Sequence, residues 1–174
     1  MSRTRLIFLS VALALVGGQI FAQGGAKAGK AASKQTAPAP SFEETLKKTK
    51  WKAEKDQDGD WKTEIQWSAE KRSQVVFVRA KATDLVPLKA REMFSLCYRS
   101  ETRPDIDTLE KIFSTKYKIG AFQLEKAESG KYSIYFRVDV PEDVKPAYLE
   151  KAISLVAEAA DNMEKELTPD KDDL

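Results

Sequence analysis

Apolar and polar residues alternate along the middle of the chain, which is the pattern of strands with one buried face. The clearest case is Trp61–Trp67, which follows an Asp58-Gly59 pair. Because aspartate-glycine pairs favour tight hairpin turns, we expect this strand to pair with one at Trp51–Ala53. The β-branched run Gln74–Ala80 predicts a third, more central strand.

A second hairpin is predicted nearer the C-terminus, with Ala121–Leu124 and Tyr132–Val140 on either side of a turn at Ser129-Gly130. Between the hairpins, Lys89–Arg99 fits two patterns. As a helix it would carry an apolar stripe, and as a strand it would place three large side chains on one face: Phe94, Leu96 and Tyr98. The strand is favoured because aromatic residues suit it better, and the helix is the alternative.

Three helices are predicted from capping patterns and from apolar residues three and four positions apart. The first begins with the capping box Ser41–Glu44, and the second repeats this cap pattern at Asp107–Glu110 and ends near Lys116 or Tyr117. The third runs from Asp143, which is expected to cap it, to Leu167, with Asp161 and Glu164 among the charged residues lying mostly off its apolar stripe.

The first 22 residues have the pattern of a secretory signal peptide. Arg3 and Arg5 precede the uncharged apolar run Leu6–Val16, and a small residue follows at Ala22. This run is shorter than the about 20 residues of a membrane-spanning helix. We therefore expect residues 1–22 to be a signal peptide, the protein to be periplasmic or secreted, and no stable membrane insertion after cleavage.

The remaining chain divides into a linker, a domain and a tail. Residues 23–40 are mostly Gly, Ala, Lys, Ser and Pro, which is typical of a flexible linker. Residues 41–168 are long enough for one core, and residues 169–174 form an acidic tail. The predicted domain is α+β, with an antiparallel sheet of five to six strands, helices packed on it, and the order α-β-β-β-(β)-α-β-β-α.

Composition narrows the functional classes. The chain has 29 basic and 27 acidic residues, and loss of the predicted signal peptide would remove two arginines and leave 27 of each. A neutral mature chain gives no electrostatic case for nucleic acid or an anionic membrane. The absence of histidine excludes histidine-dependent nucleophilic schemes and the usual zinc sites. The single cysteine, Cys97, allows no intramolecular disulfide and is expected to be buried.

Acidic residues suggest two alternative activities. The sequence Asp56–Asp60 invites a calcium or small-ligand sensor, but an EF-hand loop needs Gly at position six and Glu at position twelve, which here are Trp61 and Trp67. A solvated hairpin turn is the preferred interpretation, and no metal or cofactor is predicted. An enzyme using Glu64 with Asp60 is less favoured, because nothing in the sequence places them in a cleft. No catalytic residue is assigned.

Four residues are candidates for binding a partner: Trp61, Trp67, Tyr135 and Arg137. The two tryptophans share one strand face, where core packing is the ordinary role of such side chains. Tyr135 and Arg137 share the other face of their strand. If that face is exposed, it would bind a protein or peptide, or a second copy of the chain in a homodimer.

Four segments give the chain a family resemblance: Trp51–Trp61, Gln74–Ala80, Lys118–Phe122 and Val138–Pro141 with the helix after it. With the order of elements, they resemble the YbjN-like family of bacterial sensory-transduction regulators. The resemblance implies a fold shared with type III secretion chaperones, and it brings no catalytic residues. We therefore expect an exported, non-enzymatic binding, chaperone-like or regulatory module acting through a sheet face or edge.

Overall fold

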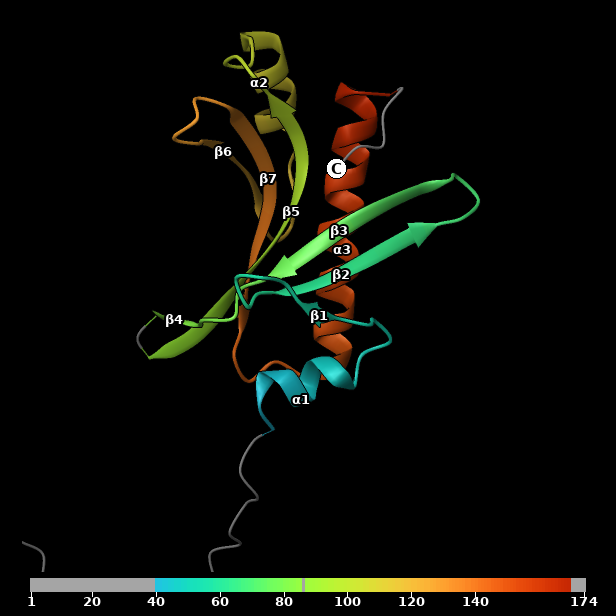
Figure 1. The fold of residues 1–174 in the computed structure, drawn as a ribbon, viewed down its shortest axis with the longest axis vertical. Helices are drawn as coiled ribbons and strands as arrows, with labels where there is room; N and C mark the ends of the chain where they lie inside the picture. Colours follow the sequence, from blue (N-terminus) through green and yellow to red (C-terminus); the bar gives the residue numbers. More distant parts are fainter. Residues whose placement is uncertain (1–39, 86, 170–174) are drawn as a thin grey trace, which may run out of the picture. The chain divides into compact units, whose positions relative to one another are not determined.

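The computed structural model describes residues 40–85 and 87–169 (Figure 1). The predicted signal peptide, nearly all of the predicted linker and nearly all of the predicted tail lie outside these residues. The helices are α1 (Phe42–Lys47), α2 (Ile106–Ser114) and α3 (Pro146–Leu167). The strands are β1 (Glu54–Lys55), β2 (Trp61–Trp67), β3 (Arg72–Val78), β4 (Thr83–Leu85), β5 (Leu88–Ser100), β6 (Ala121–Lys126) and β7 (Tyr132–Pro141).

The strands form one sheet in the order β1-β2-β3-β5-β7-β6, with β4 paired to β5 outside this path. Every pairing among these strands is antiparallel. The predicted α+β class, the antiparallel sheet and the three helices are confirmed. The sheet has seven strands, more than the predicted five to six, because β4 forms a three-residue strand on the β5 hairpin.

Helix α3 packs across β3, β5 and β7 on one face of the sheet, which we call the inner face (Figure 1). The core between them consists of fully buried apolar side chains, including Val76, Met93, Ile134, Phe136, Leu149 and Ile153. Removal of each such side chain from water stabilises the fold by about 1.5–3 kcal/mol. Helix α1 contacts α3, and Ile112 of α2 joins the same core. The opposite side of the sheet is called the outer face.

The segment with two predicted patterns is a strand, β5, and it carries a bulge. Its register against β7 shifts between Leu96 and Tyr98, so Cys97 is the extra residue. Phe94 therefore shares the outer face with Leu96, whereas Tyr98 lies opposite the buried Ile134 and packs against the core. The prediction that Tyr98 shares a face with Phe94 is wrong, because a bulge reverses the alternation beyond it.

The helix ends follow local chemistry. The predicted capping box is confirmed, since the Glu44 amide donates to Ser41 Oγ and the Ser41 amide donates to Glu44 Oε2. The predicted caps at Asp107 and Asp143 are wrong. Asp105 caps α2, because its carboxylate accepts from the Thr108 amide, and this helix ends at Ser114, before the predicted 116 or 117. Lys145 occupies the N-cap position of α3 without a side-chain capping bond, because Pro146 has the φ angle that suits the first helical position.

Two acidic residues of α3, Asp161 and Glu164, face the sheet, contrary to the prediction that they lie off the buried stripe. Both side chains are almost fully buried. Arg72 of β3 pairs with both, at 2.7 Å from Nε to Asp161 Oδ1 and 2.9 Å from Nη2 to Glu164 Oε2. Buried carboxylates require such partners, and the partner lies about 90 residues away in sequence, which helical periodicity cannot reveal.

Candidate functional site

The outer face carries a row of three aromatic side chains, which we call the aromatic row: Phe77, Phe94 and Tyr135. They come from the neighbouring strands β3, β5 and β7. The Phe77 and Phe94 rings stack with centroids 5.4 Å apart, and Tyr135 meets Phe94 edge-on at 5.8 Å. Phe94 is 8% exposed, while Phe77 and Tyr135 are partly exposed. Since the described helices gather on the inner side, this row lies on the open side of the sheet.

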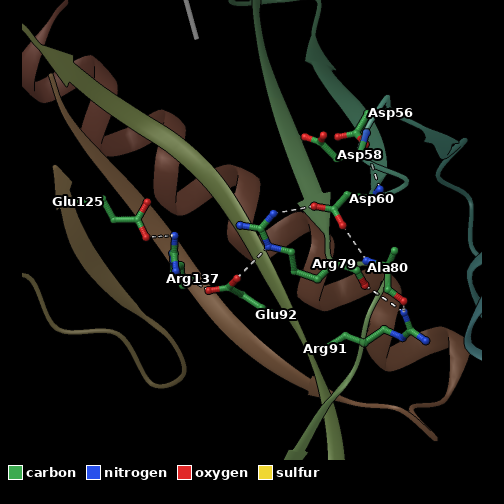
Figure 2. Close-up of polar contacts among 9 residues, drawn as sticks. All are labelled: Asp56, Asp58, Asp60, Arg79, Ala80, Arg91, Glu92, Glu125 and Arg137. Carbon is green, nitrogen blue, oxygen red and sulfur yellow. Dashed lines mark hydrogen bonds and ion pairs between the residues drawn. The ribbon is translucent and has the colours of Figure 1, made fainter. Parts of the chain in front are cut away.

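Five charged side chains of alternating sign cross the same face and form what we call the ion-pair ladder: Asp60, Arg79, Glu92, Arg137 and Glu125 (Figure 2). The closest N–O distances along it are 2.7, 3.2, 2.5 and 2.6 Å in that order. The ladder spans the sheet from the β1–β2 turn to β6. Each arginine is held by two carboxylates, so the ladder fixes the side chains of five separate segments.

The two ladder arginines also cover the central ring of the aromatic row. The guanidinium carbons of Arg79 and Arg137 lie 4.5 and 5.5 Å from the Phe94 ring centroid. Partial burial lowers the pKa of Arg79, but its hydrogen bonds to Asp60 and Glu92 outweigh burial, so the pKa is raised. Arg79 therefore stays charged, and the cation–π contacts add to the ion pairs.

The Asp56–Asp60 turn anchors one end of the ladder. Asp56 accepts hydrogen bonds from the amides of Asp58 and Asp60, at 3.0 and 2.9 Å. Asp60 is 7% exposed and accepts from the Ala80 amide at 2.8 Å as well as from Arg79. Its carboxylate thus joins this turn to the segment after β3. Within residues 40–85 and 87–169, no cluster of three or more carboxylate or thiol side chains is arranged to hold a metal ion.

Two hollows lie at the two ends of the ladder. The larger, which we call the acidic cleft, has a volume of about 710 Å³ and lies between the Asp56–Asp60 turn, the 79–85 segment and the strands β5 and β7. Its wall is fixed further by Arg91, whose Nη1 donates to the carbonyls of Arg79 and Ala80 (Figure 2). The smaller hollow, of about 280 Å³, is lined by Glu125 and Tyr135 among others.

The structure separates the four candidate binding residues into two groups. Trp61 and Trp67 lie on the inner side of β2 and pack against the core. Tyr135 and Arg137 lie on the outer face, in the aromatic row and the ladder. Their neighbours Phe94, Arg79 and Glu92 were not predicted as site residues. Local patterns do not show which strands lie side by side, and it is the strand order that brings these residues next to Tyr135 and Arg137.

The residues suggested for an enzyme or for a calcium sensor lie on β2 and on the turn before it. The exposed Glu64 points to the outer face of β2 and accepts a hydrogen bond from Gln66 Nε2 at 3.0 Å. Asp60 is engaged by Arg79 and Ala80. Both groups thus have polar partners within the protein.

Replacement of Asp60 by alanine is expected to lower the free energy of unfolding by about 2 kcal/mol, because the Ala80 amide and Arg79 lose the buried carboxylate that accepts from both. Asp58→Ala in the same turn is the matched control. The Asp58 side chain is exposed, so its removal should change stability by less than about 0.5 kcal/mol. Urea unfolding followed by tryptophan fluorescence measures both. Equal effects would contradict a structural role for Asp60.

No protein-family model, curated protein or solved structure matches the chain. Among the described residues, no helix has both the length and the apolar character needed to cross a membrane.

Proposed function

We propose that this chain is an exported, non-enzymatic binding or chaperone-like module whose outer sheet face holds a protein or peptide partner. The observation that carries the proposal is the aromatic row, which lies on the open side of the sheet with a hollow at each end of the surrounding ladder. Export is supported by the signal-peptide pattern of residues 1–22. Membership of the YbjN-like family and a type III secretion chaperone-like fold are part of the same proposal, on the resemblance alone.

The aromatic row and the ion-pair ladder together make a surface suited to a protein or peptide partner. Aromatic side chains provide large contact areas at low entropic cost, and they are enriched in interfaces between proteins. The ladder holds its arginines in place before a partner arrives, so little further ordering is needed on binding. The free side of β6 offers a second mode, in which an extended peptide adds to the sheet edge.

An enzyme is the less favoured class, since the two carboxylates suggested for it already have partners on the protein and do not converge on a cleft of their own. A calcium or small-ligand sensor at the Asp56–Asp60 turn is likewise less favoured, because Asp56 and Asp60 accept backbone hydrogen bonds there.

Selection of peptides of about nine residues from a random display library against the purified protein tests the proposal. We expect enriched peptides whose dissociation constants rise at least about fivefold on Tyr135→Ala, because loss of an aromatic contact typically costs 1 kcal/mol or more. Fluorescence anisotropy measures the constants. Tyr148→Ala is the matched control, since Tyr148 is a 48% exposed tyrosine on α3.

Failure to enrich any peptide, or equal binding to wild type and Tyr135→Ala, would overturn the proposal. Light scattering on the same samples tests whether the partner is a second copy of the chain. A wild-type dimer that Tyr135→Ala converts to monomer would show that a second copy of the chain occupies the outer face.

A further inference from the structure

The acidic cleft carries a strong imbalance of charge. Five acidic residues line it: Asp58, Asp60, Asp84, Glu92 and Asp139. Two basic residues, Arg79 and Lys81, line it as well, so the lining has a net charge of −3. The domain as a whole is close to neutral, and this imbalance is therefore local to one end of the outer face.

The acidic groups of the cleft are of two kinds. Asp60 and Glu92 form ion pairs with Arg79 in the ladder. Asp84 makes an exposed ion pair with Lys89 at 3.5 Å. The carboxylates of Asp58 and Asp139 are exposed and make no ion pair or side-chain hydrogen bond with any other described residue. Two unpaired carboxylates therefore border the cleft, and among its described lining residues Lys81 is the one basic residue outside the ladder.

The cleft is continuous with the aromatic row through Arg79, which lines the cleft and lies over the Phe94 ring. Its outer wall includes Leu85, which is 49% exposed. A side chain entering the cleft would thus meet both apolar surface and carboxylates. Lysine and arginine suit both, because each has an apolar stem and a cationic end.

We propose that the partner of the outer face is an extended basic segment of a polypeptide, which places a lysine or arginine side chain in the acidic cleft while an adjacent apolar residue contacts the aromatic row. The inference rests on the proposed function and adds the chemistry of the partner. Charge complementarity carries it, because Asp58 and Asp139 are available to a cation and Asp60 and Glu92 are fixed around it. Electrostatic complementarity of this kind contributes mainly to specificity and to the association rate.

The test uses the tightest peptide from the selection, labelled with fluorescein, and a copy in which each lysine and arginine is replaced by glutamine. We expect the selected peptides to be enriched in basic residues, and the glutamine copy to bind about tenfold more weakly. The double variant Asp58→Asn/Asp139→Asn should weaken binding of the basic peptide by about five- to tenfold, and added salt should reduce the difference. Glu128→Gln, an exposed acidic residue of the β6–β7 turn, is the control and should have no effect.

The outcomes distinguish failure of the basic partner from failure of the proposed function. Peptides that lose affinity on Tyr135→Ala but bind the double variant as tightly as wild type would overturn the basic partner and leave the proposed function standing. Enrichment of neutral or acidic peptides, or a dimer that excludes the basic peptide, would do the same. The absence of any selected peptide would overturn both. The double variant should keep its wild-type stability, because neither side chain has a partner to lose.

Discussion

Arg72→Met is expected to lower the free energy of unfolding by about 3–5 kcal/mol, because it leaves Asp161 and Glu164 buried between α3 and the sheet without the guanidinium that neutralises them. Methionine keeps much of the side-chain volume, so the loss reports charge and hydrogen bonding more than packing. Urea unfolding followed by tryptophan fluorescence is a suitable measurement, since Trp67 lies directly across from Arg72 in the sheet.

The control for this variant is Lys165→Met, which removes a cation that also contacts Asp161. The Lys165 side chain is one-third exposed, so its ion pair is weakened by solvent and should contribute less than about 1 kcal/mol. In the triple variant Arg72→Met/Asp161→Asn/Glu164→Gln we expect partial recovery, because the uncompensated charges are gone. A loss below about 1 kcal/mol for Arg72→Met would contradict the importance of the buried pairs.

Gly120→Ala is expected to be the second most damaging change, with a loss of about 3 kcal/mol in unfolding free energy. Gly120 precedes β6 with φ +78°, and a Cβ there would lie 2.6 Å from the carbonyl oxygen of Arg137 and 2.8 Å from the Phe136 ring. The backbone of β7 cannot give way without disturbing the core. Denaturant unfolding measures the effect.

Two other glycines serve as controls that distinguish the cost of a positive φ angle from the cost of a steric clash. Gly59 and Gly130 also have positive φ, of +84° and +88°, but nothing lies within 4 Å of a Cβ at either position. Alanine at these turns should therefore cost only about 1 kcal/mol, from the backbone conformation alone. If all three alanine variants lost the same stability, close packing at Gly120 would not be the cause.

Much of the fold could be predicted because its signals are local. Alternation in Trp61–Trp67 and Tyr132–Val140 predicted two strands and their buried faces, and Asp58-Gly59 predicted the turn before the first of them. The predicted partner strand at Trp51–Ala53 is wrong, because the residues that pair across this turn are Glu54 and Lys55, which lie nearer to it. The capping box at Ser41 and the apolar stripe of α3 located two helices. Each of these depends on residues within a few positions of one another.

What could not be predicted depends on residues that are far apart in sequence. The bulge at Cys97 is decided by the register between β5 and β7, and the burial of Asp161 is decided by Arg72 on another element. The candidate site also depends on residues that are far apart in sequence. Tyr135 and Arg137 were identified from one strand, but the ladder and the acidic cleft form only when the order of strands brings Arg79 and Glu92 beside them.

The bulge in β5 also limits the length of the apolar surface on the outer face. Phe94 and Leu96 are the outward apolar residues of this strand between the charged Glu92 and the bulge, and the next outward position beyond the bulge is the charged Arg99, paired with Ser133. The apolar part of the outer face therefore extends only about 7 Å along β5. A surface this short offers a partner two or three side-chain contacts, well below the about 800 Å² that each side of a long-lived complex buries. We therefore expect an association at this face to form and dissociate rapidly.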